Sequence, residues 1–333
     1  MDEAQAIPVE ATAPAKPIVK RGGLLRGAWK FAKAKPLGAF GFLIIVFLFA
    51  MTLGTPEFDF AAPALPDRPF GFQLGDPWLQ RYAPEANFYT SDGFVAVYDG
   101  PSAEHWLGTD GAGRDIWSRI VNGARRSLFV GIWALIVATI IGAGIGVITG
   151  YFGGILDIVS QRFMDALQSF PPLIALILII TINPFGGGDQ SSLLMAAFAL
   201  GLVGIPSVQR ITRGVVLSTR EQQYVESARV IGASDMRIMW GYILPNIFAS
   251  IIVVFSTGIG VVILAEAALS FIVPEKLPQG ISWGFMLSES YASIGDAPWP
   301  AVWSAAAISL AVLGFNLAGD ALRDVLDPRL RLR

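Results

Sequence analysis

Residues 127–150 read SLFVGIWALIVATIIGAGIGVITG, and the uncharged run that they begin continues to Leu156. A helix needs about 20 mostly apolar residues to cross a bilayer, because the hydrocarbon offers no hydrogen-bond partners to its backbone. This stretch meets that requirement. It therefore predicts a membrane-spanning helix.

Five further runs have the same character. Only 15% of the residues are charged and the mean hydropathy is +0.57, whereas soluble domains carry about 25% charged residues. We therefore predict an all-α integral membrane protein with six transmembrane helices. Besides 127–150, the expected spans are Leu37 to Gly54, Ala166 to Ile182, Ser191 to Gln209, Asn246 to Ala265 and Ala301 to Gly319.

Composition also excludes several functions. The chain has no cysteine and a single histidine, His105, and its net charge is −2. Thiolate chemistry is thereby excluded, a histidine-based metal site is disfavoured, and no basic surplus exists for nucleic acid. We predict no metal site and no nucleic-acid partner.

Basic residues predict the orientation, since they concentrate in cytoplasmic segments. The segment before the first span is strongly basic, the C-terminal end carries arginines, and so does the connection after the fourth span. With six crossings, both termini are expected in the cytoplasm. The cluster that opposes this orientation, because it would lie outside, is Arg114, Arg119, Arg125 and Arg126.

The expected organisation has five parts. Residues 1–20 form a disordered cytoplasmic tail, and 21–54 hold an amphipathic surface helix and the first span, with an unstructured basic segment as the alternative to the surface helix. Residues 55–124 form an external loop that is too long for a plain connector. The core with five spans covers 125–324, and 325–333 form a cytoplasmic tail.

The segment Glu221 to Asn246, EQQYVESARVIGASDMRIMWGYILPN, is a polar, amphipathic insert between two spans. Its pattern predicts a short helix from Gln222 to Ile231, which Gly232 closes in the left-handed conformation. Ser234 is placed to cap a following helix, with Asp235 in its first turn. Such a device suits the transmission of a push from a soluble partner.

This segment resembles the EAA signature in permeases of binding-protein-dependent ABC importers. The matching residues are Glu226, Ser227, Ala228, Gly232, Leu244 and Pro245, with Ser227 in place of the usual alanine. The resemblance implies a coupling helix, residues 221–245, that docks into a cleft on an ATPase subunit. It also implies that Glu226 makes polar contact there, that Ala228 permits close approach and that Gly232 supplies the turn.

A second segment, His105 to Leu128, is similar to C-type subunits of dipeptide, oligopeptide and nickel permeases, and so is the run Gly150-Tyr151-Phe152-Gly153-Gly154. Residues of this match, for which a structural role is expected, are Gly108, Thr109, Asp110, Gly113, Arg114 and Asp115. The chain departs from that family at Ile272-Val273-Pro274-Glu275, where Leu-Gly-Leu-Gly is usual, and this weakens any transfer of substrate.

The resemblance implies a type I ABC importer permease in the bacterial inner membrane, importing peptides or related solutes such as nickel chelates. The implied partners are a B-type permease, ABC ATPase subunits and an extracytoplasmic solute-binding protein. ATP and Mg²⁺ would be bound by partner subunits, so no cofactor and no enzymatic activity are expected of this chain.

Residues 142–146, GAGIG, look like a phosphate loop but lack the Lys-Ser/Thr that must follow, and no complete Walker A motif occurs in the chain. The preferred interpretation is close helix packing along a ridge of small residues. That ridge consists of Ala138, Gly142, Gly146 and Gly150.

Ionisable groups near the membrane leave alternatives open. Glu266 is a candidate pathway or gate residue, or else lies at the interface and bonds to a loop. The group Asp157, Arg162 and Asp165 is favoured as an ion-pair cluster over a proton relay, and His105 receives no partner and no role. An ion-coupled secondary transporter is the alternative function, which the lack of charge within the second, fourth and sixth spans disfavours. A membrane-embedded enzyme is disfavoured too, because no catalytic constellation can be assembled.

Overall fold

The computed structural model describes residues 31–53, 81–89, 95–182, 189–274 and 281–326. The predicted tail 1–20, residues 21–30 ahead of the first span, residues 55–80 and 90–94 of the predicted external loop, and residues 327–333 of the predicted C-terminal tail lie outside these ranges. Residues 31–34, at the end of the predicted surface helix, are helical. The chain divides into two compact units, Met1–Pro36 and Leu37–Arg333, and the packing below is that of the second. Its described residues are mainly α-helical, with β pairing limited to isolated bridges.

Long apolar helices correspond to five of the six predicted spans. In the described part of the chain, five helices are long and apolar enough to cross a membrane. They extend beyond the apolar runs at one or both ends. These are α2 (Pro36–Leu53), α3 (Ile116–Phe152), α6 (Asp189–Arg220), the continuous helix Asp235–Ile272 and α11 (Trp299–Leu326).

The third predicted span, Ala166 to Ile182, is not one straight helix. α4 (Gly154–Gln168) and α5 (Pro172–Ile182) pass the test for a span only as a pair, and they are bent by 87°. Pro171 and Pro172 stand at the break. Proline lacks the amide hydrogen and disfavours helix in the residue before it, so the helix stops and restarts there.

The second span begins before the predicted position, at Ile116 rather than Ser127, and α3 is 37 residues long. Residues 116–124, assigned above to the external loop, are therefore helical. Asp115 caps this early start, since its carboxylate accepts a hydrogen bond from the Ser118 backbone amide at 2.8 Å.

The helix from Asp235 to Ile272 begins inside the segment 221–245 and continues without a break into the fifth predicted span. It contains α8 (Asp235–Ile238), the π-helical η1 (Met239–Ile243) and α9 (Leu244–Ile272). Pro245 follows shortly after the π-helical η1, so the backbone hydrogen bond that a proline removes falls at an irregular turn of the helix. With 38 residues, this helix is about 57 Å long. We call it the long rod.

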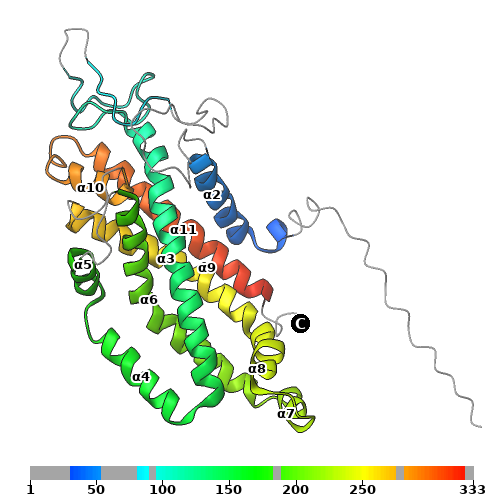
Figure 1. Cartoon of the computed structure of the whole chain (residues 1–333). Helices are drawn as coiled ribbons and strands as arrows, with labels where there is room; N and C mark the ends of the chain where they lie inside the picture. The colour runs from blue at the N-terminus through cyan, green and yellow to red at the C-terminus, as the bar shows by residue number, and fades with distance from the viewer. Residues whose placement is uncertain (1–30, 54–80, 90–94, 183–188, 275–280, 327–333) are drawn as a thin grey trace, which may run out of the picture. The chain divides into compact units, whose positions relative to one another are not determined.

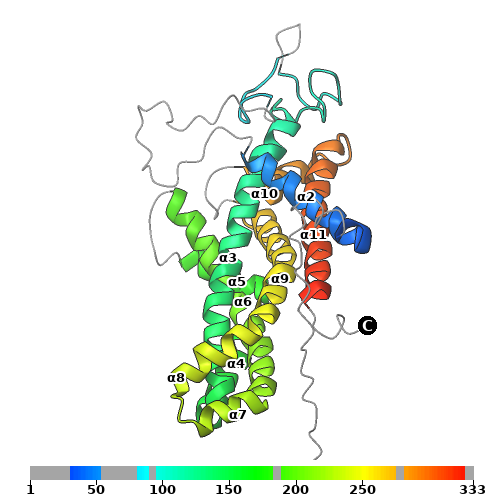
Figure 2. The same cartoon turned by 90° about the vertical axis from the view of Figure 1, so that its right-hand side faces the viewer.

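Figures 1 and 2 show α3 and α6 side by side, with the long rod and α11 packed beside them. α2 packs on α11, where a Cβ added to Gly41 would stand 2.7 Å from the Ala318 amide nitrogen. The main apolar cluster joins α2, α3, the rod and α11, and its members include Leu48, Leu128, Ile263 and Phe315.

One helix was not predicted. α10 (Trp283–Tyr291) lies between the rod and α11, and Ser282 caps it by accepting a hydrogen bond from the Phe285 amide. Trp283 is fully buried and donates its indole hydrogen to the Ile120 carbonyl at 3.0 Å. The signal in the sequence was the serine before an apolar run that is too short to span a membrane.

The small-residue ridge of α3 lies against α6. An added Cβ on Gly142 would stand 2.9 Å from the Ile205 carbonyl oxygen, and one on Gly146 would stand 2.8 Å from that of Gln209. A Cβ on Gly150 would stand 2.9 Å from Cβ of Val216, and Ala138 is buried. Glycine is therefore required for the observed separation of the two helices.

Gly146→Ala should destabilise the protein, whereas Gly144→Ala should be neutral or stabilising. The first methyl group has no room, and overpacking costs about 1–3 kcal/mol. The second meets nothing within 4 Å, and alanine improves helix propensity by about 1 kcal/mol. Thermal unfolding of the purified protein in detergent would compare them. Equal melting temperatures would contradict the close packing.

Candidate functional site

The segment 221–245 folds into a short helix, a sharp turn and the start of the long rod. The helix is α7 (Gln223–Val230). Gly232 has a φ of 82°, the amide of Gly232 bonds to the Arg229 carbonyl at 3.1 Å, and that of Ala233 bonds to the Ala228 carbonyl at 3.0 Å. These two bonds around a left-handed residue form a Schellman motif. Gly232 thus supplies the predicted turn.

α7 has a buried face and an exposed end. Val225 and Ala228 are buried in an apolar cluster with residues of α3, α6 and the long rod. Val230 and Ile231 are instead 82% and 78% exposed. We call Val230 and Ile231 the exposed apolar pair. The sequence pattern placed Ile231 on the buried face, but the helix ends before it and the turn directs it outward.

This arrangement corrects the role expected for Ala228. Its side chain packs inside the chain and is not available for close approach to another protein. Glu226 is exposed, as a polar contact residue requires. Ser227 is exposed too, but its hydroxyl donates to the Gln223 carbonyl at 2.8 Å within the helix.

Three other predicted positions lie at the start of the long rod. Ser234 occupies the N-cap position of α8, but its side chain makes no capping hydrogen bond, so the predicted hydroxyl cap is wrong. Leu244 packs at the edge of the same apolar cluster as Val225. Pro245 is exposed.

Charged residues join α4 to α6 at the same end of the molecule. Arg213 makes a bidentate ion pair with Asp157. Arg210 pairs with Asp165 at 3.0 Å, and Arg162 lies 3.7 Å from the same carboxylate. Asp157 and Asp165 thus bridge helices, which favours the ion-pair interpretation over a proton relay.

A second ion-pair network lies at the opposite end of the unit, around residues 81–89 and 95–115 (Figure 1). Arg119, whose side chain is fully buried, bonds to Asp110 and, at 2.7 Å, to Glu289 of α10. Arg114 lies 2.9 Å from both Asp110 and Glu289. Burial alone lowers the pKa of Arg114, but its bond to Glu289 and the charge of Asp110 outweigh this and raise the pKa. Arg114 and Arg119 belong to the cluster that opposed the predicted orientation, and their positive charges are compensated by these carboxylates.

The other residues for which the family resemblance implied a structural role shape the same region. Gly108 and Gly113 have φ values of 82° and 71°, and Thr109 is buried and accepts a hydrogen bond from the Asp99 amide. His105 has a partner, contrary to expectation, since its Nδ1 donates to Asp115 at 3.0 Å. The contact was hidden because it depends on the fold of this loop.

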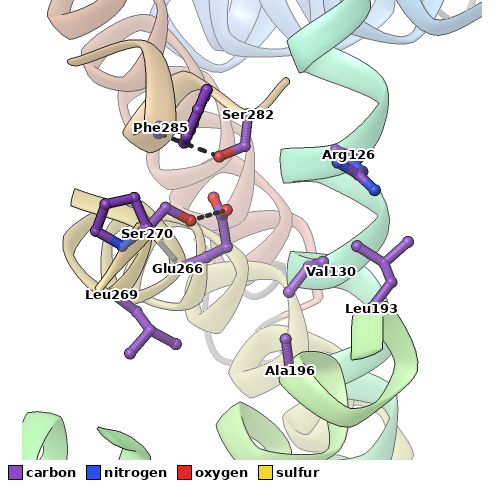
Figure 3. A pocket seen from close by; sticks show the side chains of 10 residues that line it. Arg126, Val130, Leu193, Ala196, Glu266, Leu269, Ser270, Ser282 and Phe285 are labelled. Atoms are coloured by element: carbon purple, nitrogen blue, oxygen red, sulfur yellow. Dashed lines mark hydrogen bonds between the residues drawn. The ribbon is translucent and has the colours of Figure 1, made fainter. Parts of the chain in front are cut away.

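Glu266 is buried within the protein, with 5% of its surface exposed. One carboxylate oxygen accepts a hydrogen bond from Ser270 at 2.7 Å, one turn along α9, and the other has no hydrogen-bond partner among the described residues. Figure 3 shows it beside a small cavity that Arg126 and Ser282 also line. The cavity of about 30 Å³ has room for about two water molecules. Glu266 therefore forms this hydrogen bond within its own helix and lines the cavity together with the residue that caps α10.

Long apolar helices, with a short amphipathic helix fastened to the end of one of them, are the arrangement expected of a transport permease. Residues 142–332 match the family described as binding-protein-dependent transport system inner membrane component. The chain belongs to this family, whose members are the permease subunits of ABC importers. It is thus a multi-pass inner membrane protein, and the ion-coupled alternative is set aside.

Two relatives illustrate the similarity. The chain is 42% identical over 232 residues to the dipeptide transport system permease protein of Alkalihalophilus pseudofirmus, covering 70% of this chain and 74% of the relative. It is 39% identical over 256 residues to the glutathione transport system permease protein of Pectobacterium atrosepticum, covering 76% of this chain and 82% of the relative.

Proposed function

We propose that this chain is one of two permease subunits of an importer of short peptides. Support comes from the relatives, which are named for dipeptide and glutathione transport, and glutathione is itself a peptide derivative. Both relatives align over at least 70% of this chain. Peptides are therefore the substrate class that these relatives support.

The ATPase docks on α7 and the exposed apolar pair. The observation that carries this proposal is an amphipathic helix with two solvent-exposed apolar residues at its end. A turn closed by two backbone hydrogen bonds fixes the position of that end. Apolar side chains in such a position favour contact with a partner protein. Glu226, on the exposed side of the same helix, adds a charge to the docking surface.

The long rod is the output of this docking site. It begins after the Gly232 turn and continues without interruption to Ile272. Displacement of α7 by closure of the ATPase would move the rod as a rigid body against its neighbours. That movement would open the pore alternately to the two sides of the membrane.

The roles of the partner subunits and the orientation of the chain follow from this placement of α7. ATP and Mg²⁺ are bound and hydrolysed by the partner subunits, and this chain needs no cofactor and performs no catalysis. With α7 in the cytoplasm, residues 81–89 and 95–115 and helix α10 face outward, since they lie at the opposite end of the unit (Figure 1). An extracytoplasmic solute-binding protein delivers peptide to that end, a B-type permease completes the pore, and both termini are cytoplasmic.

Uptake measurements test the substrate class. Cells that lack this chain should lose uptake of a radiolabelled dipeptide, and plasmid-borne wild-type protein should restore it. Excess unlabelled dipeptide or glutathione should compete with the labelled dipeptide, while a nickel chelate should not. Restored nickel uptake without restored peptide uptake would overturn the proposed substrate.

A further inference from the structure

Tyr151, the second-last residue of α3, lies where four helices meet. The residue is 6% exposed and belongs to the apolar cluster that holds Val225 and Ala228 of α7. The guanidinium of Arg229, also on α7, lies 5.7 Å from the ring centroid. Tyr151 therefore contacts the proposed docking helix directly.

The Tyr151 hydroxyl reaches across to the start of the long rod. It donates a hydrogen bond to a carboxylate oxygen of Asp235 at 2.6 Å, and Asp235 is the first residue of α8. The bond joins residues that are 84 positions apart in the chain. Hydrogen bonds to an ionised acceptor are shorter and stronger than neutral ones.

The backbone of Tyr151 is held as well. Arg220, the last residue of α6, donates from one guanidinium nitrogen to the carbonyls of Gly150 and Tyr151 at 2.9 and 3.2 Å. These carbonyls belong to the last turn of α3, where helical partners are missing. α3 and α6 are thereby joined at the end to which α7 is attached.

The turn between α7 and α8 does not need the Tyr151 hydroxyl. Its own backbone bonds close it around Gly232, and the aromatic ring can fill its place in the cluster without the oxygen. The hydroxyl bond therefore adds a specific connection between the rod and α3. Apart from this bond, the beginning of the rod packs on Tyr151 through the apolar cluster, and apolar contacts resist sliding less than a directional bond does.

From this geometry we propose that the Tyr151–Asp235 hydrogen bond is a coupling link. It makes the inner end of α3 follow the long rod when α7 is displaced, so Tyr151 is a positioning residue for transport. The proposal rests on the proposed docking of the ATPase at α7. It goes beyond that docking because it names the contact by which movement leaves α7 and α8 for α3.

Tyr151→Phe tests the link, because it removes only the hydroxyl. In the complete transporter reconstituted in proteoliposomes, peptide imported per ATP hydrolysed should fall about fivefold, as the loss of one hydrogen bond predicts. Asp235→Ala should have the same effect, and Asp235→Asn, which keeps an acceptor oxygen, should recover most of the wild-type ratio. The double variant Tyr151→Phe with Asp235→Ala should be no worse than either single variant.

Co-purification of the ATPase with each variant separates the possible failures. An unchanged ratio in Tyr151→Phe with the ATPase attached would overturn the link and leave the docking proposal intact. Failure of the wild-type chain to retain the ATPase would overturn the proposed docking itself. A fall in the amount of folded protein with a normal ratio would show a purely structural role, and would also overturn the link.

Discussion

The double change Val230→Asp with Ile231→Asp should detach the ATPase from this subunit. Both side chains are almost fully exposed, and burial of two such groups contributes about 3–6 kcal/mol to an interface. Aspartate loses that contribution and adds the cost of burying unpaired charge. Because about 1.4 kcal/mol corresponds to a tenfold change in affinity, the ATPase recovered with the tagged variant should fall more than about tenfold.

The matched control is Ile294→Asp, which places one new charge on an exposed apolar residue at the end of the unit with α10. It should leave ATPase recovery at the wild-type level. Equal recovery from the double variant and from this control would contradict docking at α7. Quantitative immunoblots of the same membranes would confirm that all variants are inserted in equal amounts.

Gly232→Val should reduce peptide uptake at least about tenfold. Residues with a side chain pay about 1–2 kcal/mol in the left-handed conformation, and a β-branched residue is worse than average. No heavy atom lies within 4 Å of the added Cβ position, so the effect comes from the backbone and not from a clash. The Schellman turn would open, and displacement of α7 would no longer move the long rod.

Gly232→Asn is the control, because asparagine adopts this conformation more readily than other residues with side chains. It should retain a substantial part of the uptake rate, while valine reduces the rate at least about tenfold. Initial rates of labelled dipeptide uptake at equal membrane levels would decide. Wild-type transport by the valine variant would show that the rigid turn is not needed.

Much of the fold could be predicted from the sequence because lipid imposes a simple requirement on it. A long uncharged run can be satisfied only by a helix or a closed barrel, and five predicted spans are helices. The residues at which the helices begin and end were harder to predict. α3 continues outward through Arg119, whose charge is neutralised by Glu289, 170 positions away. A sequence does not reveal that pairing, so charged residues appeared to mark the end of the span.

In the candidate site, too, some features could be predicted from the sequence and others could not. Gly232 was predictable because a helix that ends in a left-handed residue has a local signature. The burial of Ala228 and the link between Tyr151 and Asp235 were not, because both depend on where α3 and α6 end. The helix break at Pro171 and Pro172 had a local signal, but the apolar residues that follow it outweighed that signal in the pattern.

Site-specific cross-linking tests the central claim most directly, and the absence of cysteine from the chain makes it clean. Ile231→Cys would be the only thiol in this subunit, and a thiol-to-amine cross-linker would be applied to membranes that hold the complete transporter. We predict an adduct between this subunit and the ATPase, and none from Ile294→Cys at the other end. No ATPase adduct from Ile231→Cys, or an equal adduct from Ile294→Cys, would contradict the account.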